Sequence, residues 1–461
     1  MRFIGRVKEQ DAIAYLTSQS DYRGCIVYGR RRLGKTELLK HCLLNRDAPC
    51  IFFQCLQDSE QANVEALTRT TQQVLGLSHL HFESFPELIS YIFEYSCTKE
   101  VYLVLDEYPY VRRTVSGMDS RLQAIIDRYQ SSSKLKFFLT GSSIATMENI
   151  LSADNPLYRR FHLQLLIKEM DYLDSSEFYH SFSEEDKVRC YAAFGGVPFY
   201  NQQIDSTRSV KENIIRLLSG EFSHLEDDIT INLKEELSKI SNASAVFSAI
   251  AEGAFHFSDI LSKSHINSSA SLSDVLEKLL KMDLIEYISP INDHKNKMKS
   301  GYRIADSSVQ FYYQYIYRYK SARAILSDET FYQNYISDHF ENAHVPKKFE
   351  KIAMQYLIRL NRSGKLNPLL TDIGTYWYDV PSENRNGQFD IVGKCDGGYV
   401  FYEVKYTKSP VTDEIINEEI KQVSRTTLRP VGYGFFSRSG FKISDNTHYQ
   451  LVTLQDIYHL D

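Results

Sequence analysis

The chain has 461 residues, of which 43% are hydrophobic and 24% are charged, the composition of an ordinary globular protein. Its formal net charge of −6 excludes a protein that binds nucleic acid through overall positive charge alone. The seven cysteines include no C-x-x-C pair, which favours reduced thiols over a disulfide framework or a zinc site. No apolar run approaches the ~20 residues that cross a bilayer, and the N-terminal residues turn charged too early for a signal peptide. We therefore expect a cytoplasmic protein with no membrane partner.

Short apolar stretches alternate with amphipathic helical stretches over residues 1–165. This alternation is typical of an α/β fold, in which a parallel sheet carries helices on both faces. At ~150 residues per domain, the length of the chain allows roughly three domains. The four predicted strands of the N-terminal sheet are 24–28, 50–55, 101–105 and 135–140.

A complete G-x-x-x-x-G-K-[ST] pattern follows the first predicted strand and precedes a helical stretch. In this context, backbone N–H groups and a helix N-terminus surround the phosphates of a nucleotide. Lys35 would reach the β- and γ-phosphates, and the Thr36 hydroxyl would ligate Mg²⁺. We therefore predict that the chain binds a nucleoside triphosphate. The binding residues are Gly29, Arg30, Arg31, Arg32, Leu33, Gly34, Lys35 and Thr36, with Glu37 directly after them.

Two acids end the third predicted strand. Asp106 at the strand tip is placed to hold Mg²⁺ through water, and Glu107 is the natural residue to orient or deprotonate the attacking water. An acidic turn after a core strand is common alone, but this one follows a phosphate-binding loop at a suitable distance. The pair therefore predicts a hydrolase, with Glu107 as the base and Lys35 as the phosphate ligand.

Two further features are candidates for contacts with the γ-phosphate. Ser142 and Ser143, which follow the fourth predicted strand, are polar groups that would sense that phosphate. Arg159 and Arg160, after a predicted helix, offer an arginine finger that acts within the chain or from a neighbouring subunit of a homo-oligomer. The alternative for the arginine pair is a solvated position on the surface.

The stretch 240–306 has the order of a winged helix, with three short helical segments followed by two β-rich runs. Its third helical segment carries Lys278 and Lys281, but an acid four residues earlier offsets each of them. The basic hairpin tip at 294–299 would lie along DNA phosphates, or it is a solvated loop of a module that contacts protein. The aromatic stretch 311–319 is better explained by packing between domains than by stacking on bases.

A second group of charged residues lies in the C-terminal part of the chain. Asp390 is on one predicted strand, and Glu403 and Lys405 project together from the next. Asp390 and Glu403 would share one Mg²⁺, and Lys405 would position the attacking water or offset developing charge. Glu350, on the preceding helix, would be an additional ligand. The alternative is ordinary alternating charge on a half-exposed strand.

The charge balance of this C-terminal part argues against tight binding of bare duplex DNA. From Phe340 onward, fifteen Lys and Arg residues balance fifteen Asp and Glu residues. A domain without net positive charge lacks the usual sequence-independent attraction to phosphates. Lys408, Lys421, Arg425 and Arg429 would still be available to line one face.

Several of these segments together resemble the archaeal-type ATPases, P-loop proteins related to AAA+ and origin-recognition ATPases. The matching segments are Phe3-Ile4-Gly5-Arg6, the loop Gly29 to Thr36, Leu105-Asp106-Glu107-Tyr108-Pro109 and Gly195-Gly196-Val197-Pro198. The last of these is similar to the helical-lid motif of the family, so the resemblance implies that Pro198 lies near the nucleotide and that this nucleotide is ATP.

The winged helix and Asp390…Glu403-Val404-Lys405 resemble the downstream half of that family, which is similar to the PD-(D/E)xK nuclease fold. One position departs from the family motif, because this chain has Gln388 where the family has an acid. The resemblance implies five parts: a P-loop ATPase core at 1–165, a helical lid at 166–238, a winged helix at 239–306, a helical connector at 307–339 and an α/β restriction-endonuclease-like domain at 340–461.

The leading hypothesis is a Mg²⁺-dependent ATPase whose nucleotide state regulates a C-terminal nuclease-like domain acting on DNA. A second hypothesis is an ATP-driven switch or adaptor, in which a vestigial nuclease fold binds a protein partner or DNA. A third is a nucleotide-responsive regulator that binds DNA. The first is favoured over the second only because Asp390, Glu403 and Lys405 occur together.

Overall fold

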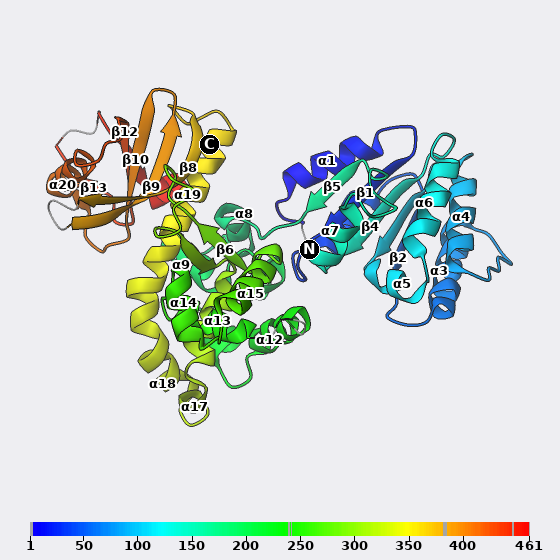
Figure 1. The fold of residues 1–461 in the computed structure, drawn as a ribbon, viewed down its shortest axis with the longest axis horizontal. Helices are drawn as coiled ribbons and strands as arrows, with labels where there is room; N and C mark the ends of the chain where they lie inside the picture. The colour runs from blue at the N-terminus through cyan, green and yellow to red at the C-terminus, as the bar shows by residue number, and fades with distance from the viewer. Residues whose placement is uncertain (1–2, 238–239, 241, 381–384, 445–446, 461) are drawn as a thin grey trace. The chain divides into compact units, whose positions relative to one another are not determined.

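The chain folds into two compact units, Met1–Glu169 and Met170–Asp461, each with its own sheet. Figure 1 shows the elements of both units along the chain. Among the described residues, no helix is both long enough and apolar enough to span a membrane. This computed structural model describes residues 3–237, 240, 242–380, 385–444 and 447–460.

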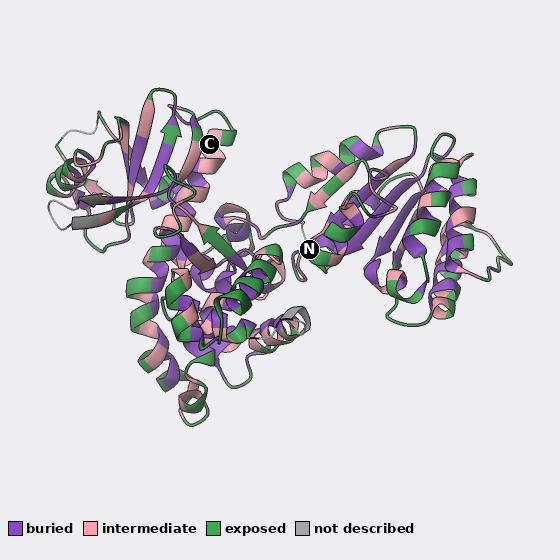
Figure 2. Cartoon of the chain, in the orientation of Figure 1, coloured by how far each residue is buried: buried purple, intermediate pink, exposed green. Residues whose placement is uncertain are grey.

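Five parallel strands form the sheet of the first unit, in the order β2-β3-β4-β1-β5. Every residue of β3 and β4 is buried, which explains why their sequences are almost continuously apolar rather than alternating. Figure 2 shows this burial along the middle of the sheet. The predicted α/β fold with a parallel sheet is therefore confirmed. The strands are β1 (Arg23–Tyr28), β2 (Cys50–Gln54), β3 (Tyr102–Asp106), β4 (Lys136–Gly141) and β5 (Leu163–Leu166).

The helices of the first unit connect these strands. In Figure 1, α3, α4 and α6 cover one side of the sheet, and their apolar residues share one core with the central strands. Ser59 and Ser84 cap α3 and α4 by accepting backbone N–H groups of the first turn. The helices are α1 (Val7–Thr17), α2 (Lys35–Leu43), α3 (Glu60–Leu75), α4 (Phe85–Ser96), α5 (Pro109–Thr114), α6 (Met118–Tyr129) and α7 (Ile144–Leu151).

The second unit begins with short helices. Helix α9 ends at Phe194, and Gly195 follows it with a φ of 66°. A Cβ at Gly196 would lie 1.9 Å from the carbonyl oxygen of Met170, so only glycine fits. These elements are α8 (Tyr172–Ser176), η1 (Glu177–Tyr179), α9 (Glu184–Phe194), α10 (Pro198–Asn201), α11 (Val210–Ile214), η2 (Ile215–Ser219) and α12 (His224–Leu237).

Three helices and an antiparallel strand pair follow, in the order expected of a winged helix. Lys278 and Lys281 of the third helix form ion pairs with Asp274 and Glu277, so the offset of charge expected from the sequence is present. The elements are α13 (Ala243–Ala251), α14 (Phe257–Ser264), α15 (Ser269–Lys281), β6 (Ile285–Ile288) and β7 (Gly301–Ile304).

Aromatic side chains of the stretch 311–319 pack inside the second unit, and a role between domains stays a prediction. Tyr313 stacks on Phe247 of α13, with ring centroids 5.1 Å apart, and Tyr315 is 1% exposed. The elements from this stretch to the last long helix are α16 (Ser307–Phe311), η3 (Tyr312–Tyr317), α17 (Lys320–Arg323), α18 (Asp328–Tyr332), η4 (Gln333–Ser337), η5 (Phe340–His344) and α19 (Val345–Arg362).

A mixed sheet in the order β14-β12-β10-β9-β8 forms the C-terminal part of the second unit. Its strands β8, β9 and β10 are antiparallel, whereas β10, β12 and β14 are parallel. The elements are β8 (Leu370–Val380), β9 (Arg385–Cys395), β10 (Gly398–Lys405), β11 (Val411–Thr412), α20 (Asp413–Val423), β12 (Pro430–Ser437), β13 (Phe441–Lys442), β14 (Gln450–Thr453) and α21 (Leu454–Tyr458).

The loop between β6 and β7 docks on this C-terminal sheet. Ile291 donates its backbone N–H to the carbonyl oxygen of Thr375 on β8, at 2.9 Å. Its side chain is buried in the aromatic core of the sheet, next to Tyr376 and Phe389. The hairpin of the winged-helix segment and the C-terminal sheet therefore share one core.

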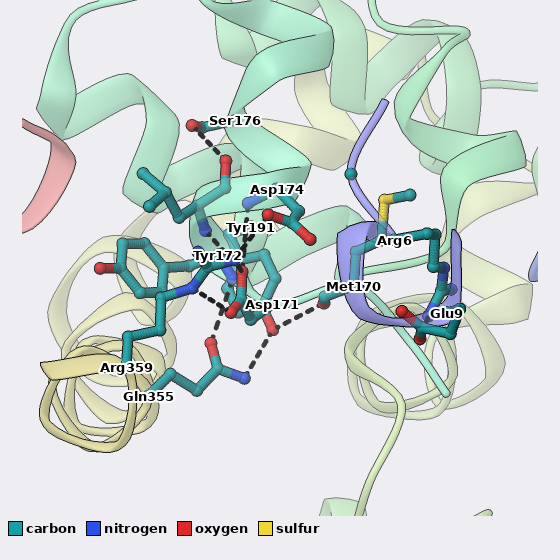
Figure 3. A network of polar contacts seen from close by, with 12 residues as sticks. Arg6, Glu9, Met170, Asp171, Tyr172, Asp174, Ser176, Tyr191, Gln355 and Arg359 are labelled. Carbon is teal, nitrogen blue, oxygen red and sulfur yellow. Dashed lines mark hydrogen bonds and ion pairs between the residues drawn. The ribbon is translucent and has the colours of Figure 1, made fainter. Parts of the chain in front are cut away.

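A polar network ties the start of the second unit to α19 (Figure 3). The Arg359 guanidinium donates to Asp171 at 2.7 Å and to Asp174 at 2.5 Å. Gln355, one turn earlier, accepts the backbone N–H of Tyr172 and donates to the hydroxyl of Tyr191. These contacts fix α8 and α9 against the long helix that precedes the C-terminal sheet.

Candidate functional site

The glycine-rich loop, residues 29–36, lies between the end of β1 and the first residues of α2, as the sequence predicts. Gly34 has a φ of 85° and Gly29 a φ of 146°, in a region that side chains rarely adopt. A Cβ at Gly29 would lie 2.3 Å from the carbonyl oxygen of Ile167. Glycine is therefore required at 29 for a close backbone approach and at 34 for the turn into the helix.

Lys35 is buried and its ammonium group is directed into the loop. Its Nζ donates to the carbonyl oxygens of Gly29 at 2.8 Å and Arg30 at 2.9 Å. It also lies 3.2 Å from the hydroxyl oxygen of Ser142, which follows β4. The ammonium group therefore joins the phosphate-binding loop to the end of the neighbouring strand.

Thr36 and Asp106 meet at the carboxyl end of the sheet. The Thr36 hydroxyl donates to Asp106 Oδ2 at 2.9 Å, and Asp106 is only 3% exposed. A hydroxyl oxygen and a carboxylate oxygen in contact are ligands that suit Mg²⁺, a hard cation. The donor set therefore fits the predicted ion.

Glu107 stands next to Asp106 in a left-handed backbone conformation, with a φ of 56°. Ser142 donates its backbone N–H to the Glu107 carboxylate at 3.1 Å and also donates its hydroxyl to it. The structure thus brings Glu107, Ser142 and Lys35 into one chain of contacts. Ser142, predicted to sense the γ-phosphate, here contacts the predicted base.

The other side chains of the loop are held by neighbours or face solvent. Arg6, from the segment before α1, donates to the carbonyl oxygens of Leu33 at 3.2 Å and Lys168 at 2.5 Å, and so fixes the loop from outside. Arg30 forms an ion pair with Glu169 at 3.5 Å, and Arg31 donates to the Tyr110 hydroxyl at 3.3 Å. Arg32 is exposed. Glu37 forms an ion pair with Lys40 at 3.0 Å.

The two candidate finger arginines differ in their surroundings. Arg160 forms two hydrogen bonds with the carboxylate of Asp127 on α6, at 3.1 and 2.9 Å. Arg159 is exposed, and its guanidinium lies 5.1 Å from the ring centre of Tyr158. Of the two, Arg159 therefore has the guanidinium that faces solvent.

Pro198, implied by family resemblance to lie near the nucleotide, is the first residue of α10 in the second unit. It follows the close contact between Gly196 and Met170, where the Met170 N–H donates to the Gly196 carbonyl at 2.8 Å. Its relation to the nucleotide stays a prediction.

The C-terminal carboxylates lie on adjacent strands. Ile391 pairs with Tyr402, so Asp390 on β9 lies beside Glu403 on β10, and Asp390 accepts the backbone N–H of Val404 at 3.2 Å. Glu403 forms an ion pair with Lys405. The predicted constellation is therefore assembled on one face of the hairpin.

Glu419, on α20, joins this constellation. It lies 3.2 Å from the ammonium group of Lys405, which is thus held between two carboxylates. Glu403 and Glu419 also line a small hollow whose other walls are apolar and aromatic, including Phe389 and Tyr433. Lys405 is therefore fixed in place by residues from both the strand and the helix.

Burial raises the pKa values of the three predicted C-terminal ligands. Burial raises the pKa of Glu403 to about 8, and the charge of Asp390 adds to the shift against the opposing effect of Lys405. Burial, followed by the charge of Asp390, raises the pKa of Glu350, while Lys347 opposes the change. Burial also raises the pKa of Asp390. Asp390 therefore lies within electrostatic reach of both Glu350 and Glu403.

Carboxylate oxygens suit Mg²⁺ or Mn²⁺, so the chemistry of these side chains fits a divalent ion. Their arrangement is less favourable, because Lys405 occupies one side of Glu403. Within the part of the chain that the structure describes, no group of three or more His, Cys, Asp or Glu residues has a geometry that would hold a metal ion. The metal role of Asp390, Glu403 and Glu350 stays a prediction.

Comparisons with known proteins bear on both units. Residues 3–204 match a family described as "ATPase domain predominantly from Archaea". The chain carries an archaeal-type ATPase domain. Residues 312–423 match a second family, described as "Archaea bacterial proteins of unknown function".

The relatives of this chain match most of its length. The uncharacterized protein MJECL04 of Methanocaldococcus jannaschii is 24% identical over 433 residues, which are 93% of this chain and 91% of that protein. Among solved structures, the Walker-type ATPase PABY2304 of Pyrococcus abyssi is 21% identical, with a TM-score of 0.51 over 68% of this chain and 96% of that one. The Aeropyrum pernix ORC2 protein is 11% identical, with a TM-score of 0.44 over 69% and 96% of the two chains. The PABY2304 match supports the fold.

The sequence alone did not point to three side chains at the two candidate sites. Arg6 was part of a matching segment but carried no role, and its contact with the loop depends on a fold that brings residues 6 and 33 together. Thr140 is inside a buried strand, where its hydroxyl gives no sequence signal. Glu419 belongs to an ordinary charged helical face, and only the packing of α20 brings it to Lys405.

Proposed function

We propose that this protein is a Mg²⁺-dependent ATPase whose nucleotide state regulates a C-terminal nuclease-like domain that acts on DNA. The observation that carries the ATPase proposal is the contact of Thr36 with Asp106, directly beside Glu107. Three side chains from the loop and the neighbouring strand end thus converge where a triphosphate on the loop would place its γ-phosphate. Asp106 and Thr36 would hold Mg²⁺, which neutralises negative charge on the phosphates when it is bound.

This geometry supports a role for each of the chain's own residues. Lys35 exchanges the carbonyl oxygens of Gly29 and Arg30 for phosphate oxygens, to which its ammonium group is attracted more strongly. Glu107 accepts the proton of the attacking water, or orients that water, from its place at the strand end. Ser142 holds the Glu107 carboxylate and is within reach of Lys35, so it links the base to the phosphate-binding loop.

The proposal for the C-terminal domain is supported by Asp390, Glu403 and Lys405 on one hairpin face. Asp390 and Glu403 would hold the divalent ion, which polarises a phosphodiester and lowers the pKa of bound water. Lys405 offsets negative charge on the phosphate that is attacked. Exposed lysines on the loop between β6 and β7, which docks on the same sheet, suit the phosphates of a DNA backbone.

The alternative is an ATP-driven adaptor whose nuclease fold only binds a protein partner or DNA. The observation that favours it is the position of Lys405, whose ammonium group is engaged by both Glu403 and Glu419. Gln388 also stands where the family motif has an acid. Both features are expected of a nuclease fold that has lost catalysis: a lysine held in ion pairs, and a glutamine in place of an acid.

The ATPase proposal is tested with the full-length chain and two variants. Lys35→Ala should abolish tight ATP binding, because the loop then has no ammonium group for the β- and γ-phosphates. Glu107→Gln should keep ATP binding and lose hydrolysis. Lys40→Ala, which removes a lysine from an ion pair on the exposed face of the same helix, is the matched control. A Glu107→Gln protein that hydrolyses ATP at the wild-type rate would show that Glu107 is not the base.

The nuclease proposal is tested on the full-length chain with varied DNA substrates, Mg²⁺ or Mn²⁺, and with or without ATP. Asp390→Asn and Glu403→Gln should each abolish cleavage. The double variant that carries both changes measures Mn²⁺ binding at other places on the chain. Each single variant should give no more Mn²⁺-binding heat than this double variant, whereas the wild type should give more. Glu418→Gln, an exposed neighbour of Glu419 on α20, serves as the control. If the wild type and the double variant give the same Mn²⁺-binding heat and neither cleaves, the adaptor function replaces the nuclease.

A further inference from the structure

One buried hydroxyl contacts both acids at the end of β3. Thr140 on β4 is 0% exposed, and its hydroxyl donates to Asp106 Oδ1. The same oxygen accepts the backbone N–H of Glu107 at 3.1 Å. A hydroxyl has one hydrogen to donate and two lone pairs that accept, so both contacts are satisfied at once.

With the contact from Thr140, each oxygen of the Asp106 carboxylate accepts a hydrogen bond. Asp106 Oδ2 accepts the hydroxyl of Thr36 at 2.9 Å, and Oδ1 accepts the hydroxyl of Thr140. A side chain held at both oxygens cannot rotate without losing a bond that water cannot replace at a buried position. Thr140 therefore sets the direction in which Asp106 presents its remaining lone pairs.

The contact with Glu107 supports a strained backbone. Glu107 has a φ of 56°, and a left-handed conformation costs a residue with a side chain roughly 1–3 kcal/mol. Two successive backbone groups are anchored to Thr140, since the Glu107 N–H binds its hydroxyl and the Tyr108 N–H binds its carbonyl oxygen at 2.9 Å. The turn that projects Glu107 from the strand is thus fixed to β4.

We infer that Thr140 is a positioning residue for ATP hydrolysis, which fixes the carboxylate of Asp106 and the backbone of Glu107 through one hydroxyl. The inference rests on the ATPase function proposed above. Nothing in it requires Thr140 to touch the nucleotide. It acts by holding the metal-binding acid and the base in register with each other.

The test compares Thr140→Val, which keeps the shape and loses the hydroxyl, with Thr140→Ser, which keeps the hydroxyl. In the full-length chain, Thr140→Val should lower kcat by about tenfold or more and raise the Mg²⁺ concentration for half-maximal rate by about fivefold, as expected for loss of a buried hydrogen bond to a charged group. KM for ATP at saturating Mg²⁺ should change by less than about threefold, because Lys35 is untouched. Thr140→Ser should restore kcat to within about threefold of the wild type.

Thr71→Val is the matched control. Thr71 of α3 is also 0% exposed in the same unit, and its hydroxyl has no hydrogen-bond partner among the described residues. This substitution should leave kcat and the Mg²⁺ dependence unchanged. If Thr71→Val changed kcat and the Mg²⁺ dependence as much as Thr140→Val, both effects would come from weaker packing of the core. That result would overturn the inference.

A second readout separates this inference from the proposed function. If the wild type does not hydrolyse ATP, the ATPase proposal fails, and Thr140 is then judged by calorimetry of ATP binding at several Mg²⁺ concentrations. Thr140→Val should weaken ATP binding only when Mg²⁺ is present. The inference is overturned if Thr140→Val keeps the wild-type Mg²⁺ dependence, or if Thr140→Ser is as impaired as Thr140→Val.

Discussion

Ser142 holds the carboxylate of Glu107 with both its backbone N–H and its hydroxyl, and the same hydroxyl oxygen lies 3.2 Å from Lys35 Nζ. When Lys35 turns to the phosphates, Ser142 is left with Glu107 alone. Ser142→Ala should therefore lower kcat by about tenfold, because the base loses one of two groups that orient it. ATP affinity should change little, since the contacts of Lys35 with the phosphates remain. Steady-state kinetics together with ATP titration separate the two effects.

Ser143→Ala is the control for that variant, because the Ser143 hydroxyl is exposed and its hydrogen bond within the described residues is to Thr146 of the next helix turn, away from Glu107 and Lys35. Its kcat should equal that of the wild type. A Ser142→Ala protein with unchanged kcat would mean that the Ser142 contact belongs to the nucleotide-free state alone.

The two candidate arginines give opposite predictions. Arg159→Ala should lower kcat by at least about tenfold, because its guanidinium is exposed and available to a γ-phosphate in the same chain or a neighbouring one. Arg160→Ala should leave kcat unchanged and cost at most about 1 kcal/mol of stability, since its ion pair with Asp127 is partly exposed. Turnover assays at several protein concentrations distinguish a finger in the same chain from one in a neighbour. If Arg160→Ala is the inactive variant, the assignment of Arg159 is wrong.

The parts of the two candidate sites that could be predicted are formed by residues close together in the sequence. The loop from Gly29 to Thr36 carries its own pattern, and the two acids directly follow a strand whose apolar run is unmistakable. Asp390 and Glu403 were also predictable as neighbours, because a short turn joins their strands. In each case the relevant geometry is local.

The parts that were not predictable depend on contacts between distant segments. Thr140 lies one strand away from Asp106, and its register is set by the whole sheet. Glu419 reaches Lys405 only because α20 packs beside β10. The docking of Ile291 on β8 joins residues 84 positions apart through apolar packing, which has no directional sequence signal.

The docking of Ile291 on the C-terminal sheet can be tested by removing its side chain from the aromatic core. Ile291→Ala should lower the free energy of unfolding by about 2–4 kcal/mol, the usual cost of emptying a buried aliphatic site. It should also free the loop between β6 and β7, so that trypsin cuts there faster at Lys295 or Lys297. Met298→Ala on the same loop is the control, because that side chain is 85% exposed and should change neither quantity. Unchanged stability of the Ile291→Ala chain would show that the loop does not contribute to the core of the C-terminal sheet.

A buried histidine makes the stability of the second unit depend on pH. His344, at the end of η5, is 3% exposed, and its Nε2 lies 3.0 Å from the carbonyl oxygen of Ala192 on α9. Burial lowers the pKa of this imidazole to about 3, and the positive charge of Lys348 lowers it further. In the folded protein His344 is therefore neutral at every pH above about 3, whereas in the unfolded chain it gains a proton below about 6.5.

Because the unfolded chain binds the extra proton, stability is complete above pH 6.5 and is lost as the pH falls toward 3. The slope is about 1.4 kcal/mol per pH unit well below 6.5, which amounts to about 2 kcal/mol between pH 7 and pH 5. His344→Gln keeps an amide that can donate to Ala192 and does not titrate, so this difference should disappear. Denaturant unfolding of both full-length proteins at pH 7 and pH 5 measures it. Equal pH dependence in the two proteins would mean that other groups control acid stability, and that the neutral imidazole contributes nothing to it.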